Sequence, residues 1–274
     1  MSLDINKIYN ENCIDTLYRM PDDCIDLTVT SPPYDKLRDY KGFEFSFEIV
    51  ARQLHRVTKD GGVVVWIVGD AIENGSETGT SFKQVLYFKE LGFILHDTMI
   101  YLKAGFSFPD QTRYNPVFEF MFVLSKRQKP KTINLIVDQI NKYHGAKIAR
   151  LHSSRQTNGE IQENSAWRNN RAKEVKVNGV RDNVWYYSTG FGNSSPDEIA
   201  FNHPAIFPEQ LAADHIYSWS NEGDLVYDPF IGSGTVAKMA HLQKRNWIGS
   251  EISSEYCQIA QKRIQPYLDQ LTLI

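Results

Sequence analysis

The amino-acid sequence predicts an α/β fold: a doubly wound, mostly parallel sheet that carries a basic insertion. Two observations support this prediction. Short apolar runs alternate with segments of helical periodicity in the first and the last part of the 274-residue chain. One of these runs, VVVWIVGD at 63–70, is apolar almost without interruption, which is typical of a parallel strand covered on both faces.

In the first part of the chain, the predicted elements follow one another as alternating strands and helices. The predicted strands are 24–31, 63–70, 94–103 and 117–126, and the predicted helices are 45–62 and 81–93. The first helix places Val50, Leu54 and Val57 on one face, and a Gly-Gly pair closes it. Gly92 closes the second helix.

The alternation stops at about residue 126 and resumes near the end of the chain. The later predicted helices are 202–220, 234–244 and 254–268, and the later predicted strands are 223–230 and 246–252. Pro208 opens the first of these helices. The long stretch between the two regions is polar and rich in asparagine, which indicates an insertion. The sequence therefore divides into 1–125, an insertion at 126–194, and 195–274.

Composition and cysteine spacing exclude several protein classes. Hydrophobic residues make up 42% and charged residues 23%, which is ordinary for a globular protein with its own core. Cys13, Cys24 and Cys257 form no CxxC pair, so neither a metal site nor a disulfide framework is predicted. The polar first residues do not resemble a signal peptide, and no apolar run reaches 18 residues. We therefore expect a cytoplasmic protein without a membrane span.

The charge of the chain is unevenly distributed. Between Lys126 and Arg181 there are 13 Lys or Arg residues and four acids, an excess of about +9 in a chain whose net charge is −3. This stretch fits a solvated charged insertion, and it also fits a surface for a polyanion.

The segment LVYDPFIGSGTVAKMA at 225–240 reads as a strand, a glycine-bearing turn and a helix. Gly232 and Gly234 allow the backbone to approach a ligand closely, and the helix start offers unpaired N–H groups. The next strand ends in Glu251, whose carboxylate can accept hydrogen bonds from both hydroxyls of a ribose. We therefore predict a nucleoside site. A dinucleotide site, with Ala237 at the third glycine position, and an ordinary tight turn remain alternatives.

A second unusual strand end is the tetrapeptide Ser31-Pro32-Pro33-Tyr34. The prolines stiffen the backbone where a hydroxyl and carbonyl oxygens can point off the end of a strand, and the tyrosine adds a flat face. Such a corner suits a planar group with an exocyclic amine, although a plain turn is the alternative. In a doubly wound sheet, this corner and the glycine loop would lie on the same edge.

With DPFIGSGTV at 228–236 and TSPPY at 30–34, the chain resembles the S-adenosylmethionine-dependent DNA amino-methyltransferases, which modify adenine at N6 or cytosine at N4. The order of the two motifs resembles the β group of these permuted enzymes, and the resemblance covers about 8–125 and 195–265. It implies a permuted Rossmann-like methyltransferase fold. Residues 1–125 would form its catalytic half, 126–194 a target-recognition insertion, and 195–274 its cofactor-binding half.

The resemblance also implies site residues. The implied catalytic residues, which would hold the target base and its amine, are Ser31, Pro32, Pro33 and Tyr34. The implied cofactor-binding residues are Asn12, Cys13, His203, Pro204, Phe207, Asp228, Phe230, Gly232, Gly234 and Glu251. Cys13 also fits a small buried hydrophobic residue. Asp70, at the end of the strand 63–70, fits either a contact with a ligand or a helix cap.

Within the insertion, Arg155, Arg168 and Arg171 are candidates to read guanine edges, and Trp167 is a candidate to stack on a base. Each of these four residues also fits a phosphate contact or plain solvation. DNA is thus the expected partner, and a homodimer and a cognate restriction endonuclease are further partners that the resemblance suggests.

The predicted activity is transfer of a methyl group from S-adenosylmethionine to the exocyclic amine of a flipped-out DNA base. Serine in the first position of the tetrapeptide is, in the resembling enzymes, more typical of cytosine N4 than of adenine N6, so cytosine is favoured. Adenine remains an alternative, as do methylation of RNA or of a protein amide and a nucleic-acid-binding protein without catalysis. A dehydrogenase is the weakest alternative, because nothing in TSPPY positions a hydride.

Overall fold

The computed structural model describes residues 3–33, 46–104, 112–148, 153–155, 157–163, 173–206 and 208–270. The chain forms two compact units. Unit 1 comprises Met1–Asn134 and Asn183–Ile274, and unit 2 comprises Leu135–Asp182. Among the residues described, no helix is long and apolar enough to span a bilayer.

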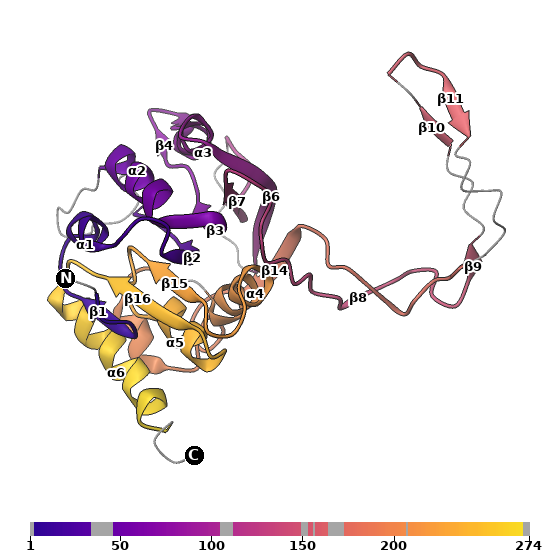
Figure 1. Cartoon of the computed structure of the whole chain (residues 1–274). Coiled ribbons are helices and arrows are strands. Elements are labelled where there is room, and N and C mark those ends of the chain that lie inside the picture. Colours follow the sequence, from indigo (N-terminus) through magenta and orange to yellow (C-terminus); the bar gives the residue numbers. More distant parts are fainter. Residues whose placement is uncertain are drawn as a thin grey trace. The chain divides into compact units, whose positions relative to one another are not determined.

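Unit 1 is built on one eight-stranded sheet (Figure 1). The strands, in spatial order, are β1 (Lys7–Tyr9), β16 (Asn246–Ser250), β15 (Leu225–Asp228), β2 (Ile25–Thr30), β3 (Thr58–Val68), β7 (Phe118–Lys126), β6 (Phe93–Ala104) and β14 (Val184–Ser188). Neighbouring strands are parallel, except that β7 runs antiparallel to both β3 and β6. The predicted doubly wound, mostly parallel sheet is confirmed.

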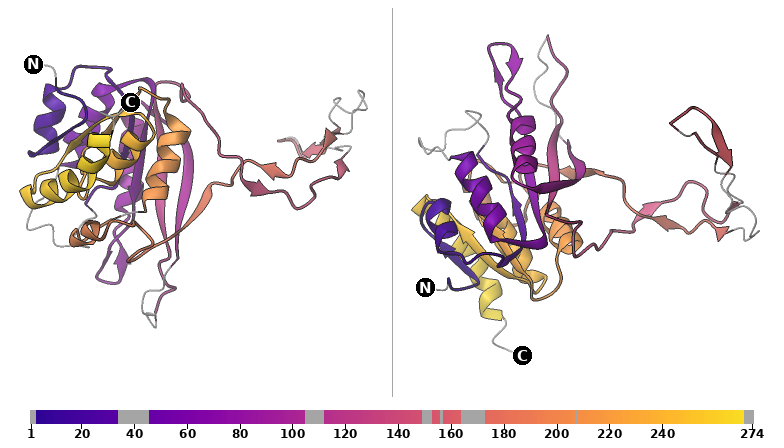
Figure 2. Two further views of the ribbon diagram at one scale, coloured as in Figure 1. Left: turned by 90° about the horizontal axis from the view of Figure 1, so that it is seen from below. Right: turned by 45° about the horizontal axis from the view of Figure 1, so that its top comes forward.

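Helices cover both faces of this sheet, as Figures 1 and 2 show. One layer consists of α1 (Cys13–Arg19), α2 (Phe47–Val57) and α3 (Thr80–Glu90), and the other of α4 (Glu209–Trp219), α5 (Thr235–Leu242) and α6 (Ser254–Gln270). A short 3₁₀ helix, η2 (Glu198–Asn202), precedes α4. Because β3 lies in the middle of the sheet with a helical layer on each side, all its residues from Val63 to Val68 are buried. This accounts for its continuous apolar run.

Several elements of unit 1 were not predicted, among them β1, α1 and β14. Strand β1 has three residues, α1 has seven, and β14 lies inside the stretch predicted as insertion. Strand β14 pairs in parallel with β6 and therefore belongs to the central sheet. In addition, α2 ends at Val57 and strand β3 starts at Thr58, so the predicted helix 45–62 was too long.

Unit 2 contains short two-stranded antiparallel pairs. These pairs join β8 (Gln139–Ile140) to β13 (Asn178–Gly179), β9 (Lys147–Ile148) to β12 (Lys173–Glu174), and β10 (Ser153–Arg155) to β11 (Ile161–Glu163). An ion pair between Arg181 and Asp138 lies beside the first pair, and it holds the pKa of that carboxyl below its ordinary value. Unit 2 spans fewer residues than the predicted insertion at 126–194, because residues at both ends of that stretch belong to unit 1.

Lys126 illustrates this difference. Its Nζ is buried and donates to Asp23 Oδ1 at 2.6 Å and to the carbonyl oxygen of Thr58 at 2.7 Å. The neighbouring Arg127 pairs with Asp60. Lys126 therefore stabilises unit 1 and does not belong to a free basic surface, whereas the paired Arg127 remains 61% exposed.

Candidate active site

The two unusual strand ends of the sequence lie side by side. Strands β15 and β2 are neighbours in the sheet, and each runs toward the same edge. The Thr30 hydroxyl, just before the proline corner, donates to Asp228 Oδ1 at 2.7 Å, just before the glycine loop. Both side chains are buried. One hydrogen bond thus joins the corner that was predicted to hold a base to the loop that was predicted to hold a nucleoside.

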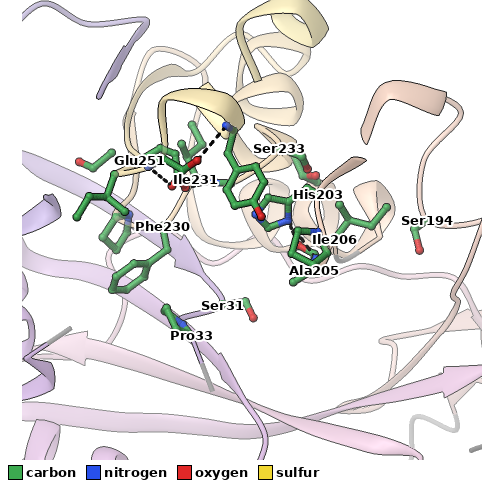
Figure 3. Close-up of a pocket in the computed structure, with 18 of the residues that line it drawn as sticks. Ser31, Pro33, Ser194, His203, Ala205, Ile206, Phe230, Ile231, Ser233 and Glu251 are labelled. Atoms are coloured by element: carbon green, nitrogen blue, oxygen red, sulfur yellow. Dashed lines mark hydrogen bonds between the residues drawn. The ribbon is translucent and has the colours of Figure 1, made fainter. Parts of the chain in front are cut away.

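A cavity of about 540 Å³ opens at this edge of the sheet (Figure 3). The predicted residues that line it are Asn12, Cys13, Ser31, Pro33, His203, Pro204, Phe230, Gly232 and Glu251. Figure 3 shows Glu251 and Ser194 toward opposite sides of the view, with Phe230, Ser31 and His203 between them. The cavity therefore runs across the ends of several strands and contains residues of both predicted sites.

The glycine loop needs its glycines for two different reasons. Gly232 and Gly234 have φ values of +49° and +84°, in the left-handed region that favours glycine. A Cβ on Gly232 would lie 2.9 Å from Nε2 of His203, at the cavity wall. A Cβ on Gly234 would lie 2.9 Å from Cβ of Ala260 in α6. Gly234 is not part of the cavity wall, so its glycine is required for the turn and for packing.

Glu251 is held in one orientation at the end of β16. Its Oε2 accepts a hydrogen bond from the Gly232 N–H at 3.0 Å, and its Oε1 accepts one from the Ser253 N–H at 2.8 Å. Burial raises the pKa of Glu251 above its ordinary value. A carboxylate has about four acceptor positions, so each oxygen can still accept a further hydrogen bond from a ligand hydroxyl.

Asp228 has a different position from the one that the resemblance implied. It is buried behind the cavity, and its Oδ1 accepts hydrogen bonds from the Thr30 hydroxyl and, at 3.0 Å, from the Phe230 N–H. Burial is the main cause that raises the pKa of Asp228 to about 7. Asp228 therefore supports the glycine loop from behind the cavity. Pro32 is likewise buried and absent from the wall.

Asn12 and Cys13 lie at the start of α1. The Asn12 side chain caps this helix by accepting a hydrogen bond from the Ile14 N–H at 2.9 Å. Burial raises the pKa of the Cys13 thiol to about 12, so the thiol stays protonated and forms a small apolar part of the wall. Asp70 caps α3 through Ser81, at 2.9 Å from its N–H and 2.5 Å from its Oγ, and this favours the helix-cap interpretation.

A family model described as DNA methylase, named for N6 and N4 methyltransferases, matches residues 25–262 of the chain. The matched segment includes both strand ends and most of unit 1.

The chain belongs to this DNA methylase family.

Individual relatives agree with the family. The chain is 58% identical, over 90% of its length and 91% of the relative, to the orphan methyltransferase M.BamHII of Bacillus amyloliquefaciens. Its fold is similar to that of PvuII DNA methyltransferase, which is cytosine-N4-specific. The TM-score is 0.67 and the identity 19%, and the match covers 98% of this chain and 93% of the PvuII enzyme. The chain is also similar to TTHA0409 of Thermus thermophilus, solved with S-adenosyl-L-methionine, with a TM-score of 0.61, 22% identity and coverage of 95% of each chain.

Membership in the DNA methylase family decides between several alternatives that the sequence left open. The family is described as DNA methylase, which favours a DNA methyltransferase over a dehydrogenase and over a methyltransferase that acts on RNA or on a protein amide. Some predicted residues lie outside the described part of the chain, namely Tyr34, Phe207, Trp167, Arg168 and Arg171. Arg155 belongs to β10 in unit 2.

The sequence analysis missed part of the cavity wall in this DNA methylase. Tyr101 and Lys103 lie two residues apart on β6, and Glu119 is the cross-strand partner of Tyr101 on β7, so the three share one face of the sheet. Lys103 Nζ and Glu119 Oε1 are 2.8 Å apart. Burial raises the pKa of Tyr101. The sequence did contain a signal for two of these residues: Tyr101 and Lys103 alternate at the end of the predicted strand 94–103, which places them on one face of the sheet.

Within the ranges that the structure describes, no group of three or more His, Cys, Asp or Glu side chains is arranged to hold a metal ion.

Proposed function

We propose that this chain transfers the methyl group of S-adenosylmethionine to the N4 amine of cytosine in DNA. The observation that carries the proposal is the Thr30–Asp228 hydrogen bond, because it holds the two strand ends together at one cavity. Membership in the DNA methylase family supports the reaction class. Ser31 supports the choice of cytosine, since serine in this position is more typical of cytosine N4 enzymes in the resembling family.

The residues of the cavity fit S-adenosylmethionine. Its volume of about 540 Å³ is in the range of pockets that bind ligands of this size. Glu251 offers acceptors for the ribose hydroxyls, and Phe230 and Ile252 offer apolar surface for the adenine. When bound, S-adenosylmethionine supplies a methyl group that its sulfonium activates for transfer. The binding of this cofactor by TTHA0409, a protein of similar fold, is consistent with this assignment.

The proline corner would orient the target amine. An exocyclic amine is a weak nucleophile, because its lone pair is delocalised into the ring. The Ser31 hydroxyl and the carbonyl oxygen of Pro32 can accept its N–H hydrogens, draw the nitrogen toward tetrahedral geometry and stabilise the positive charge that develops on it. The reaction forms a nitrogen–carbon bond, breaks a sulfur–carbon bond and releases one amine proton. Alignment of this kind contributes about 7–11 kcal/mol to catalysis.

The target base must leave the double helix to reach the cavity, which costs a few kcal/mol. Residues of the basic stretch would offset this by contacting the DNA: Arg155, Arg168 and Arg171 are the candidate cations, and Trp167 is the candidate to stack on a base. The role of these residues in DNA binding remains a prediction. A homodimer and a partner restriction endonuclease also remain predictions.

Two measurements test the proposal. First, DNA from cells that express the chain is digested to nucleosides, and the nucleosides are identified by mass spectrometry. Second, the same DNA is sequenced by a single-molecule method that reports each modified base with its sequence context. We expect N4-methylcytosine at one short recognition sequence. N6-methyladenine would support the alternative base, and the absence of any methylated base in cells with the soluble protein would contradict the proposal.

A further inference from the structure

A network of four charged side chains, two buried cations and two partly buried acids, lies behind the cavity. It consists of Asp197, just before η2, Glu209 at the start of α4, Lys238 in α5 and Arg263 in α6. The side chains of Lys238 and Arg263 are 2% and 0% exposed. With two cations and two anions the network is neutral, as a buried group of charges must nearly be.

Arg263 connects this network to the glycine loop. Its Nη1 donates to the carbonyl oxygen of Ser233 at 2.6 Å, to Ser233 Oγ at 2.9 Å and to Thr235 Oγ1 at 3.2 Å. Ser233 and Thr235 both line the cavity. A single planar guanidinium therefore fixes the backbone and two side chains of the cofactor loop from behind.

The other nitrogens of Arg263 contact a second segment that contributes to the cavity wall. Its Nε donates to Asp197 Oδ2 at 3.0 Å, and its Nη2 donates to Glu209 Oε1 at 2.7 Å and to Ser195 Oγ at 3.2 Å. The segment 198–206 between the two acids, which we call the strap, contributes His203 and further residues to the cavity. The strap is therefore anchored at both of its ends by groups that Arg263 contacts.

Lys238 offers an internal comparison. Its Nζ binds the same acids, at 2.8 Å from Asp197 Oδ2 and 2.9 Å from Glu209 Oε1. Among the described residues, Nζ of Lys238 donates hydrogen bonds to the two acids that flank the strap and to no group of the glycine loop. Burial alone would raise the pKa of Asp197, but hydrogen bonds from Lys238 and Arg263 leave it below the ordinary value. Asp197 thus remains a charged partner of both cations.

We propose that Arg263 is a positioning residue for cofactor binding, because it fixes the glycine loop and the strap relative to each other. The inference rests on the proposed function of the cavity. It differs from a merely structural role in one respect: loss of Arg263 must weaken cofactor binding beyond what loss of an equally buried cation in the same network does.

Two matched variants test this. Arg263→Met and Lys238→Met each remove one buried cation from the network, and both are expected to lower the thermal midpoint. Binding of S-adenosylhomocysteine is measured by calorimetry on the full chain, and KM and kcat are measured with S-adenosylmethionine and DNA. We expect Arg263→Met to weaken binding and raise KM for S-adenosylmethionine by about 10–100-fold, with a smaller change in kcat. We expect Lys238→Met to change both by less than about 3-fold.

Arg263→Lys keeps the charge without the planar fork, and we expect it to recover thermal stability better than cofactor affinity. If the two methionine variants weaken cofactor binding equally, or if Arg263→Lys binds like the wild type, the proposal is overturned. Should the Arg263 variants not fold, Ser195→Ala removes a partner of Arg263 that does not line the cavity. It should weaken binding about 3-fold, and unchanged affinity would count against the proposal.

Wild-type protein separates this inference from the proposed function. If the wild type binds neither S-adenosylhomocysteine nor S-adenosylmethionine, the proposed function fails first. If the wild type binds S-adenosylhomocysteine and methylates DNA, and the Arg263 variants do both equally well, only the role of Arg263 is refuted.

Discussion

Replacing Thr30 by valine removes the hydroxyl that joins the end of β2, just before the proline corner, to Asp228, just before the glycine loop. Valine has nearly the shape of threonine, so the packing of β2 should be preserved. The variant leaves the buried Asp228 carboxyl without its 2.7 Å partner. A buried acceptor that loses its hydrogen bond destabilises the folded state by about 1–3 kcal/mol. We therefore expect the free energy of unfolding, measured with urea, to fall by about that amount.

The same variant should impair catalysis. Since the hydrogen bond sets the spacing of the two strand ends, its loss allows the corner to shift relative to the cofactor loop. A small displacement of reacting groups reduces the rate steeply, so we expect kcat/KM for DNA to fall by about 10–100-fold.

Thr28, two residues earlier on β2, provides the control. Its hydroxyl is fully buried and has no hydrogen-bond partner among the described residues. Thr28→Val should therefore be neutral or stabilising and should retain activity. If Thr30→Val proves as stable and as active as Thr28→Val, the Thr30–Asp228 hydrogen bond does not hold the two strand ends in place.

Three further predictions concern the same edge of the sheet. Ser31→Ala should lower kcat by about 10–100-fold while the calorimetric affinity for S-adenosylhomocysteine stays within about 2-fold, and full activity would exclude the serine from the mechanism. Gly234→Ala should destabilise the protein by about 1–3 kcal/mol more than Gly75→Ala in urea, because both have left-handed φ but only at 234 would the Cβ meet Ala260 at 2.9 Å, whereas at 75 it meets no described atom within 4 Å. Burial raises the pKa of Asp228 to about 7 from an ordinary 3.8, so the folded state keeps a proton that the unfolded chain has released. The free energy of unfolding should then fall as pH rises from about 4 to about 7, and Asp228→Asn should flatten this dependence; an unchanged slope would contradict the assignment.

Much of the site could be predicted because it depends on local sequence. The tetrapeptide at 31–34 and the glycine loop after β15 each mark the end of a strand, and the edge rule for doubly wound sheets brings such ends together. Glu251 follows from its place at the end of the next strand. The hydrogen bond between Thr30 and Asp228 then joins residues 198 positions apart.

The remaining features depend on tertiary contacts. Strand β14 follows a long polar stretch and forms a strand of the central sheet through its pairing with β6. Arg263 looks like an exposed residue of an amphipathic helix, yet its side chain is fully buried among acids from distant segments. Lys126 looks like part of a basic surface, yet its ammonium is buried against Asp23. Single-residue charge does not distinguish a solvated cation from a buried, paired one.

We propose that one cavity holds both the methyl donor and the amine that receives the methyl group. A crystal structure of the full chain with S-adenosylhomocysteine tests it most directly. We expect the ribose hydroxyls to bind the carboxylate of Glu251 and the sulfur to face Ser31 and Pro33. A cofactor bound elsewhere, or with its sulfur turned away from the proline corner, would contradict it.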